Sequence, residues 1–188
     1  IVKLLQNPPK DKEKELLDLI KNRVNPGVDP AAQVKADFLI GLIKDSYKCP
    51  LISKKEAVIL LGSMIGGYNL QGLVDLIGGS DKELSAAAAG ELKNLVLSIN
   101  IFDDMSEMAE KGNATAFDII KSWANAEWFT NRPKMKDSYK SVVYKVNGEI
   151  NTDDFSPATF AYTRDDIPLH ANVMGGSLFA NGPKEINE

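Results

Sequence analysis

The segment at residues 139–171, YKSVVYKVNGEINTDDFSPATFAYTRDDIPLHA, marks a change in the character of this chain. The residues before it carry helical patterns, whereas residues 141–146 alternate β-branched and aromatic side chains with polar ones. Such alternation is typical of a β-strand. Asn147-Gly148 follows, and this dipeptide readily adopts the positive φ angles of a tight hairpin turn. The segment therefore predicts that a region with β-structure follows a helical one.

Short polar residues follow the predicted turn. Residues 151–157, NTDDFSP, combine turn-forming side chains with a proline, which predicts a loop. Arg164 then precedes the acidic pair Asp165-Asp166 and three apolar residues. From chemistry alone, two interpretations of Arg164 are open. It could form a common surface ion pair with Asp165 or Asp166, or it could belong to an anion-binding site beside the polar loop.

The residues before this segment predict a succession of amphipathic helices. Helical patterns are expected at residues 1–6, 11–23, 30–45, 57–61, 84–98, 103–111 and 115–129. Ser53 with Glu56, and Ser80 with Glu83, have the spacing of a capping box at a helix start. Asp29 stands where an N-cap is expected, before a proline at the first helical position. Antiparallel helices joined by short turns predict a stacked array rather than one bundle.

Apolar spacing predicts which side chains of two of these helices face the interior. The expected interior residues are Val34, Phe38, Leu39, Leu42 and Ile43 in one helix, and Phe117, Ile120, Trp123 and Trp128 in the other.

Four features that could suggest chemistry are interpreted as structural. The glycines between residues 62 and 79 lack the lysine and hydroxyl order of a phosphate loop, so we expect them to serve helix packing. Cys49 is the only cysteine, and one thiol cannot hold an iron–sulfur cluster. The single histidine, His170, is expected to be hydrogen-bonded rather than catalytic. Asp153 and Asp154 do not present the six or more oxygens of a hard-cation cage, so we predict no metal site.

Composition limits the classes of protein to which the chain can belong. It has 188 residues, of which 44% are hydrophobic and 26% charged, as in ordinary globular proteins. The net charge of −4 argues against a general electrostatic interaction with nucleic acid or an anionic membrane. No apolar run approaches the ~18 residues of a membrane span. We expect a cytoplasmic protein, and we interpret the chain, which starts without methionine, as a fragment.

Four separated blocks resemble the aconitase B family, also called aconitate hydratase 2 or 2-methylisocitrate dehydratase. The blocks are NRVNPGVD at 22–29, LGSMIGGYN at 61–69, AEWFTNRP at 126–133, and TDDFSPA at 152–158 followed by an arginine and DIPLHA at 166–171. They follow the order of the family and extend to about Met174. Four blocks in one order are much more specific than any single block.

The resemblance implies a mainly α fold, in which a HEAT-like helical array (an α-superhelix) is followed by the beginning of a β/α swivel domain. We place the helical domain at residues 1–132, a linker at 133–138 and the incomplete swivel domain at 139–188. The implied function is the N-terminal part of a hydro-lyase that interconverts citrate and isocitrate through cis-aconitate and hydrates 2-methyl-cis-aconitate. The intact family carries a [4Fe–4S] cluster, whose ligands and catalytic base lie outside this chain, so the chain alone is expected to be inactive.

The resemblance also carries site residues over to two positions. Asp153 is expected on the active-site side of the swivel domain, and Arg164 is expected to contact a substrate carboxylate. A planar guanidinium suits this role because it can form two parallel hydrogen bonds to a carboxylate. The implied partners are the tricarboxylate, the remaining aconitase domains, a second copy bound through the helical domain, and messenger RNA, with no membrane. The alternative function is an autonomous helical-repeat module for protein interaction or RNA regulation, without catalysis.

Overall fold

The structure is a computed structural model that describes residues 1–22, 31–64, 67–95, 99–131, 133–141, 143, 145–164, 170–176 and 178. The chain divides into two compact units, Ile1–Pro133 and Lys134–Glu188, which are described separately. This division lies inside the linker expected at residues 133–138, although the domain boundary itself stays a prediction. Residues 23–30, with the expected N-cap at Asp29, lie outside the described residues.

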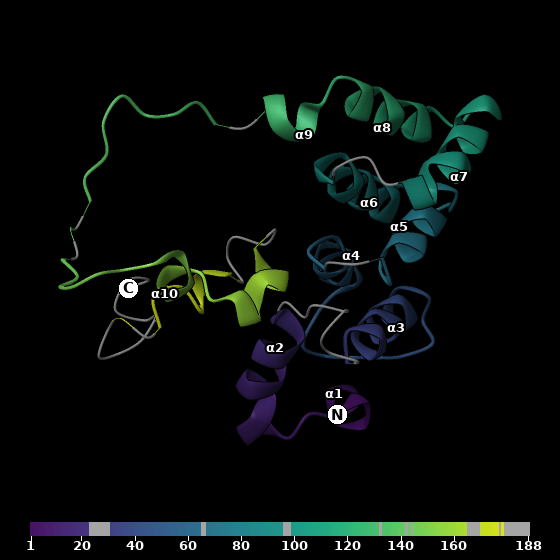
Figure 1. Cartoon of the computed structure of the whole chain (residues 1–188). Coiled ribbons are helices and arrows are strands. Elements are labelled where there is room, and N and C mark those ends of the chain that lie inside the picture. The colour runs from purple at the N-terminus through teal and green to yellow at the C-terminus, as the bar shows by residue number, and fades with distance from the viewer. Residues whose placement is uncertain are drawn as a thin grey trace. The chain divides into compact units, whose positions relative to one another are not determined.

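The regular secondary structure of the first unit, over its described residues, consists of helices (Figure 1). Its helices are α1 (Val2–Gln6), α2 (Glu13–Lys21) after a 3-10 turn (Lys10–Lys12), α3 (Ala31–Ile43), α4 (Lys54–Gly62), α5 (Leu70–Ile77), α6 (Lys82–Asn94), α7 (Ile99–Glu110), α8 (Ala114–Ala124) and α9 (Glu127–Thr130). Each helix packs on helices that follow it closely in the chain. α3 packs on α4, α4 packs on α5 and α6, and α6 packs on α8. α5 packs on α6 and α7, and α7 packs on α8. The predicted mainly α fold, with helices stacked as an array, is confirmed.

The helix starts confirm one predicted cap and correct another. Ser53 forms the full capping box with Glu56 at the start of α4, as its spacing predicts. At α6, however, the N-cap is Asp81 rather than Ser80, and its carboxylate accepts hydrogen bonds from the backbone N–H groups of Glu83 and Leu84. Aspartate and serine are equally good N-caps. The sequence pattern therefore located the helix start but misplaced it by one residue.

The helix predicted at 115–129 is interrupted. α8 ends at Ala124, and Ala126 adopts a left-handed conformation with φ of 50° before the short α9 begins at Glu127. Phe117, expected in the interior, is 59% exposed, whereas Trp123 is buried as predicted. The buried stripe contains Ala116, Ile119 and Trp123, whose three- and four-residue spacing places them on one face. Phe117 lies about 100° away from the start of that stripe and faces outward.

One α3 residue that the apolar spacing placed in the interior is also exposed instead. Phe38, Leu39, Leu42 and Ile43 are buried as predicted, but Val34 is 54% exposed. The other buried residues of α3 include Ala32 and Ala36, which are small. The helix therefore packs closely through its alanine positions, while the larger valine between them points away from the interior.

The second unit has little regular structure among its described residues. It contains α10 (Thr152–Phe155) and a 3-10 segment, η2 (Ala158–Thr163). The strand expected at residues 141–146 is wrong for the described residues there: none is in a strand, and Val143 is 88% exposed. Gly148 does have a positive φ of 96°, but Asn147 does not share it, so the expected two-residue hairpin turn is not formed. A strand needs a neighbouring strand for its backbone hydrogen bonds, and the described residues supply none.

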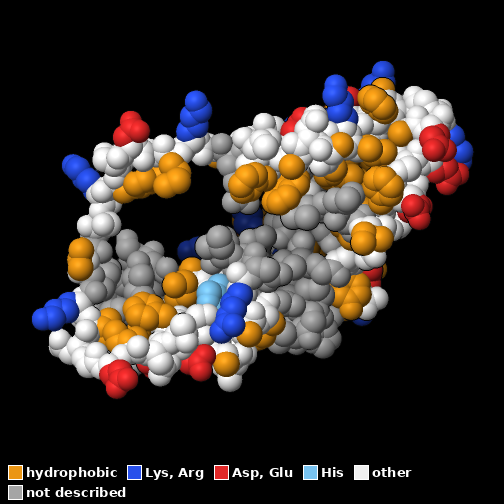
Figure 2. All heavy atoms as spheres, turned by 45° about the horizontal axis from the view of Figure 1, so that its top comes forward, with side chains coloured by type: hydrophobic (Ala, Val, Ile, Leu, Met, Phe, Trp, Pro, Cys, Tyr) orange, Lys and Arg blue, Asp and Glu red, His pale blue; other side chains and the backbone are white. Residues whose placement is uncertain are grey.

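Several large hydrophobic side chains of the helical unit remain exposed, and Figure 2 draws exposed hydrophobic side chains in orange. They include Ile99 on α7, Phe117 on α8 and Phe129 on α9. We call these three the exposed apolar residues. Within the part of the chain that the structure describes, no helix is both long enough and apolar enough to span a membrane.

Candidate functional site

The site begins with a one-turn helix where the sequence predicted only a loop. The Asn151 side chain accepts hydrogen bonds from the backbone N–H groups of Asp153 (2.8 Å) and Asp154 (3.1 Å). In return, the Asp154 carboxylate accepts one from the backbone N–H of Asn151 at 2.9 Å. This is a capping box built from asparagine and aspartate, and it starts α10. The polar residues that suggested a loop thus hold the backbone in a defined turn that leads into Ser156.

Arg164 is held on that turn by two hydrogen bonds to one residue. Its Nε donates to the Ser156 hydroxyl and its Nη2 to the Ser156 carbonyl oxygen, both at 2.9 Å. A guanidinium has five N–H donors in a planar fork. The edge formed by Nε and Nη2 is therefore occupied by Ser156. The edge formed by Nη1 and the second Nη2 hydrogen has no hydrogen bond to a described residue, and the side chain is exposed.

The Ser156 hydroxyl is fixed in turn by the only histidine. His170 Nε2 lies 3.0 Å from the Ser156 hydroxyl, and His170 Nδ1 lies 2.7 Å from the hydroxyl of Thr163. Thr163 donates its single hydroxyl hydrogen to the Phe160 carbonyl oxygen at 2.8 Å. It must therefore accept from Nδ1–H, which leaves Nε2 of the neutral ring to accept from Ser156. The prediction that His170 is hydrogen-bonded is confirmed, and its assignment as structural rather than catalytic stays a prediction.

Each residue of this network donates a hydrogen bond to the next, from Arg164 through Ser156, His170 and Thr163 to the Phe160 carbonyl oxygen. Ser156 donates its single hydroxyl hydrogen to His170 and accepts a hydrogen bond from Arg164. His170 and Thr163 are buried, whereas Arg164 is exposed. A buried pair thus anchors the serine, and the serine orients the exposed guanidinium. The role of Ser156 and Thr163 was missed in the sequence, where the only available signals were a serine before proline and a lone histidine.

Asp153, the other predicted substrate-binding residue, is exposed in the first turn of α10. Its carboxylate has no hydrogen bond or ion pair with a described residue. Ser156, at the C-cap of the same short helix, carries Arg164. Asp153 therefore lies in the first turn of α10, Arg164 is bound to the C-cap residue of that helix, and no hydrogen bond joins the two side chains. Asp165 and Asp166, the alternative partners of Arg164, lie outside the described residues.

The residues of this chain do not fit an iron–sulfur cluster. The sequence has one cysteine, Cys49, which is half-buried and far in sequence from any histidine. A [4Fe–4S] cluster requires several thiolates. Over the described ranges there is also no group of three or more histidine, cysteine or carboxylate side chains that could hold a metal ion.

Comparison with known proteins assigns both units to one family. A family model described as "Aconitate B N-terminal domain" matches residues 1–129, and one described as "Aconitate hydratase 2 N-terminus" matches residues 141–188. The chain belongs to the aconitate hydratase B family. Both descriptions refer to the N-terminal part of proteins of this family.

Three relatives named aconitate hydratase B illustrate the extent of the similarity. The Pseudomonas aeruginosa protein is 51% identical over 174 residues, which is 93% of this chain and 20% of that relative. The Escherichia coli protein is 48% identical over 174 residues, again 93% of this chain and 20% of the relative. The Synechocystis protein is 46% identical over 188 residues, or 100% of this chain and 22% of the relative. The chain therefore spans about a fifth of the length of these curated aconitate hydratase B relatives.

Proposed function

We propose that this chain supplies the helical domain and one wall of the substrate cleft of an enzyme that interconverts citrate and isocitrate through cis-aconitate. The same cleft would accept 2-methyl-cis-aconitate. The observation that carries the proposal is the state of Arg164, whose guanidinium is anchored along one edge while its other edge has no hydrogen bond to a described residue. Membership of the aconitate hydratase B family supplies the substrate class, and each of these substrates carries three carboxylates that an arginine can bind.

Arg164 suits the recognition of a carboxylate for two physical reasons. The open edge of its fork can donate two parallel hydrogen bonds to the two oxygens of one carboxylate. Because Ser156 already holds the other edge, less side-chain freedom is lost when the substrate binds. His170 and Thr163 fix the serine, so they act on substrate binding only through Arg164. Asp153 is proposed to face the same cleft.

The cluster and the other proposed partners require parts beyond these residues. We propose a [4Fe–4S] cluster in the intact protein, which would polarise the departing hydroxyl, but no step is assigned to it here because this chain offers one cysteine. We also propose a second copy bound through the helical domain, which is supported by the exposure of the apolar residues Ile99, Phe117 and Phe129. Messenger-RNA binding and a cytoplasmic location remain proposals from the family resemblance, and the net charge of −4 does not favour RNA binding by this chain alone.

The test uses a chimera in which this chain replaces the matching part of the Pseudomonas aeruginosa relative, which is 51% identical to it. Arg164→Lys keeps the charge but loses the paired geometry. We expect kcat/KM for citrate and isocitrate to fall by roughly 30- to 1,000-fold, equivalent to about 2–4 kcal/mol of transition-state binding. Lys145→Gln, at an exposed position of the same unit, should leave kcat/KM unchanged. Near-normal kinetics of Arg164→Lys, with cluster content intact, would reject the proposal.

A further inference from the structure

The dipeptide Asn147-Gly148 is a sequence motif that the proposed function does not use. The hairpin turn expected there is not formed, and the dipeptide lies in an irregular stretch between the linker and α10 (Figure 1). Asparagine is a thermally labile residue. It loses its side-chain amide most readily before glycine, because glycine has no side chain to hinder attack by its own nitrogen. This reaction needs no enzyme, so its occurrence depends on how the surrounding structure restrains the two residues.

Solvent reaches both residues of the dipeptide. Asn147 and Gly148 are exposed, as are Glu149 and Ile150 after them. A Cβ placed on Gly148 would meet nothing within 4 Å, so the space around this residue is open. Residues 145–150 belong to no helix or strand. The Asn147 side chain therefore has room to turn toward the backbone of the next residue.

The reacting groups have no hydrogen bonds that would hold them apart. Neither the side-chain amide of Asn147 nor the backbone N–H of Gly148 is hydrogen-bonded to a described residue. Gly148 has a φ of 96°, in the region of backbone conformation that favours glycine. An N–H group without a partner can lose its proton, and a side-chain amide without a partner can present its carbonyl carbon. Both partners of the reaction are therefore available.

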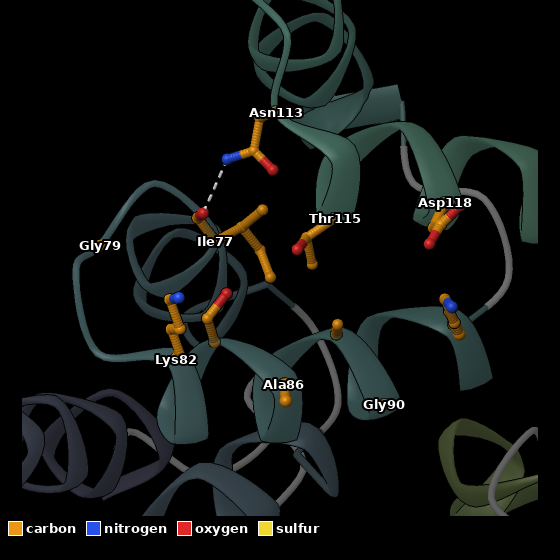
Figure 3. Close-up of a pocket in the computed structure, with 11 residues that line it drawn as sticks. Ile77, Gly79, Lys82, Ala86, Gly90, Asn113, Thr115 and Asp118 are labelled. Atoms are coloured by element: carbon orange, nitrogen blue, oxygen red, sulfur yellow. Dashed lines mark hydrogen bonds between the residues drawn. The ribbon is translucent and has the colours of Figure 1, made fainter.

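Two other asparagines of the chain show what protects such an amide. The Asn113 side chain accepts a hydrogen bond from the backbone N–H of Ala116 at 3.0 Å. Its Nδ2 donates to the Ile77 carbonyl oxygen at 2.9 Å, the bond drawn as a dashed line in Figure 3. The Asn151 side chain accepts from two backbone N–H groups in the capping box of α10. Each of these two asparagines also precedes a residue with a side chain, unlike Asn147.

We propose that Asn147 is a site of spontaneous deamidation. The backbone nitrogen of Gly148 attacks the Cγ carbon of the Asn147 side chain. A bond forms between this nitrogen and Cγ, the Cγ–Nδ2 bond breaks, and ammonia leaves with the proton of the Gly148 N–H. Water then opens the resulting succinimide ring at one of its two carbonyl carbons. Opening at the main-chain carbon gives isoaspartate, and opening at Cγ gives aspartate.

The modification changes both the charge and the backbone of the segment before α10. A carboxylate replaces a neutral amide, which adds one negative charge to a chain whose net charge is −4. Isoaspartate also routes the main chain through the former side chain, which lengthens the backbone by one carbon atom. The inference rests on the exposure and bonding of Asn147 and Gly148, so it holds whether or not Arg164 recognises a substrate.

The experiment incubates the purified 188-residue chain at pH 7 and physiological temperature and follows its tryptic peptides by mass spectrometry. Cleavage after Lys145 and Arg164 yields the peptide 146–164, which contains Asn147 and Asn151. We expect the mass gain of an amide-to-acid conversion to increase with time at Asn147, with none at Asn151. Electron-transfer fragmentation distinguishes isoaspartate from aspartate, and both should be present.

Two variants and a matched control locate the reaction. Gly148→Ala should slow the conversion about tenfold, because its methyl group hinders the attack and a positive φ is unfavourable for alanine. Asn147→Gln should abolish it, since attack on the longer side chain closes a larger ring much more slowly. Gly112→Ala, at a glycine with a φ of 90° and equally open surroundings, should leave the conversion at Asn147 unchanged. The other Asn-Gly of the sequence, at 181–182, falls in a separate tryptic peptide.

A comparison with the unfolded chain tests whether the fold leaves the dipeptide unrestrained. Unfolding in urea should change the conversion rate at Asn147 by less than about twofold, because a stretch without protecting bonds has little to lose on unfolding. A rate in the folded chain far below the rate in urea would overturn the proposal. So would a conversion at Asn147 that never exceeds the value in the sample taken at the start, or one that equals the conversion at Asn151.

Discussion

The side chain of Glu91 on α6 lies directly over Gly62 at the end of α4. A Cβ placed on Gly62 would lie 2.4 Å from Cγ and 2.5 Å from Cβ of Glu91. Both distances are well below van der Waals contact, so the missing side chain at position 62 is what allows the two helices to approach. The same approach removes water from the Glu91 carboxyl, and this burial raises its pKa.

Gly62→Ala should destabilise the helical unit. The clash involves Cβ and Cγ of Glu91, which are close to its backbone and cannot move away easily. We expect the free energy of unfolding to fall by about 1–3 kcal/mol, in spite of the better helix propensity of alanine. Gly90→Ala is the matched control on α6, because its new methyl group meets nothing within 4 Å and should stabilise by about 0.5–1 kcal/mol. Urea unfolding measures both, and equal effects would contradict the close contact.

Glu91→Gln should make the stability less dependent on pH. The raised pKa means that Glu91 favours folding fully below its unfolded pKa near 4.5, and that this contribution is lost as pH rises through the folded pKa. At pH 7 the neutral glutamine should therefore stabilise the fold, by less than about 1 kcal/mol because the carboxyl is partly solvated. The gain should vanish near pH 4.

Asp75→Asn should change the free energy of unfolding at pH 7 in the opposite direction to Glu91→Gln. Lys44 donates a hydrogen bond to Asp75 at 2.7 Å and lowers the pKa of its carboxyl. This contribution is present above the unfolded pKa of Asp75, near 3.8, and is lost as pH falls through the folded pKa. Asp75→Asn should therefore lower the stability at pH 7, where Glu91→Gln raises it. Urea unfolding at pH 7 and pH 4 measures both, and changes of the same sign would contradict the assigned causes.

Trp123→Phe should weaken the packing of α8 on α6. The indole N–H of the buried Trp123 donates to the Leu92 carbonyl oxygen at 2.9 Å. Phenylalanine removes this donor and leaves the Leu92 carbonyl oxygen with only the backbone N–H of Leu95, at 3.2 Å. The lost hydrogen bond and the smaller ring together should cost about 1–3 kcal/mol of unfolding free energy. Phe117→Leu, an exposed aromatic position of the same helix, should change it by less than about 0.5 kcal/mol. A Trp123→Phe effect as small as that of Phe117→Leu in thermal or urea unfolding would show that the hydrogen bond contributes little.

Ser156→Ala should affect substrate binding through Arg164. In the chimera, the variant removes the hydroxyl that accepts from Arg164 Nε, while the carbonyl that accepts from Nη2 remains. We expect KM for citrate to rise about five- to twentyfold with little change in kcat, a smaller loss than for Arg164→Lys. Ser156→Thr, which keeps a hydroxyl, should restore most of the affinity. A fall in kcat with unchanged KM would contradict a positioning role.

Limited proteolysis should cut first between Asn131 and Asp137. The described residues of this stretch are exposed and carry no helix or strand, and such segments are preferred sites of cleavage. The fragment that ends near Asn131 should retain its helical circular dichroism and unfold cooperatively. Early cleavage inside α6, Lys82–Asn94, would contradict the proposed helical domain at residues 1–132.

Features encoded by neighbouring residues could be predicted from the sequence. The apolar repeat and the caps act within one or two turns, so the succession of helices and the capping box at Ser53 followed from them. The family could also be assigned, because several separated motifs occur in its order. The left-handed residue Ala126 and the exposure of Phe117 could not be predicted in this way, since both depend on how α8 meets its neighbours.

The candidate site shows the same division between local and tertiary information. Arg164 could be proposed from a motif, but its anchor on Ser156 and the support of that serine by His170 required residues distant in sequence to come together. The strand expected at residues 141–146 failed for a related reason. A helix satisfies its own backbone hydrogen bonds, whereas a strand depends on a neighbour that its own sequence does not contain.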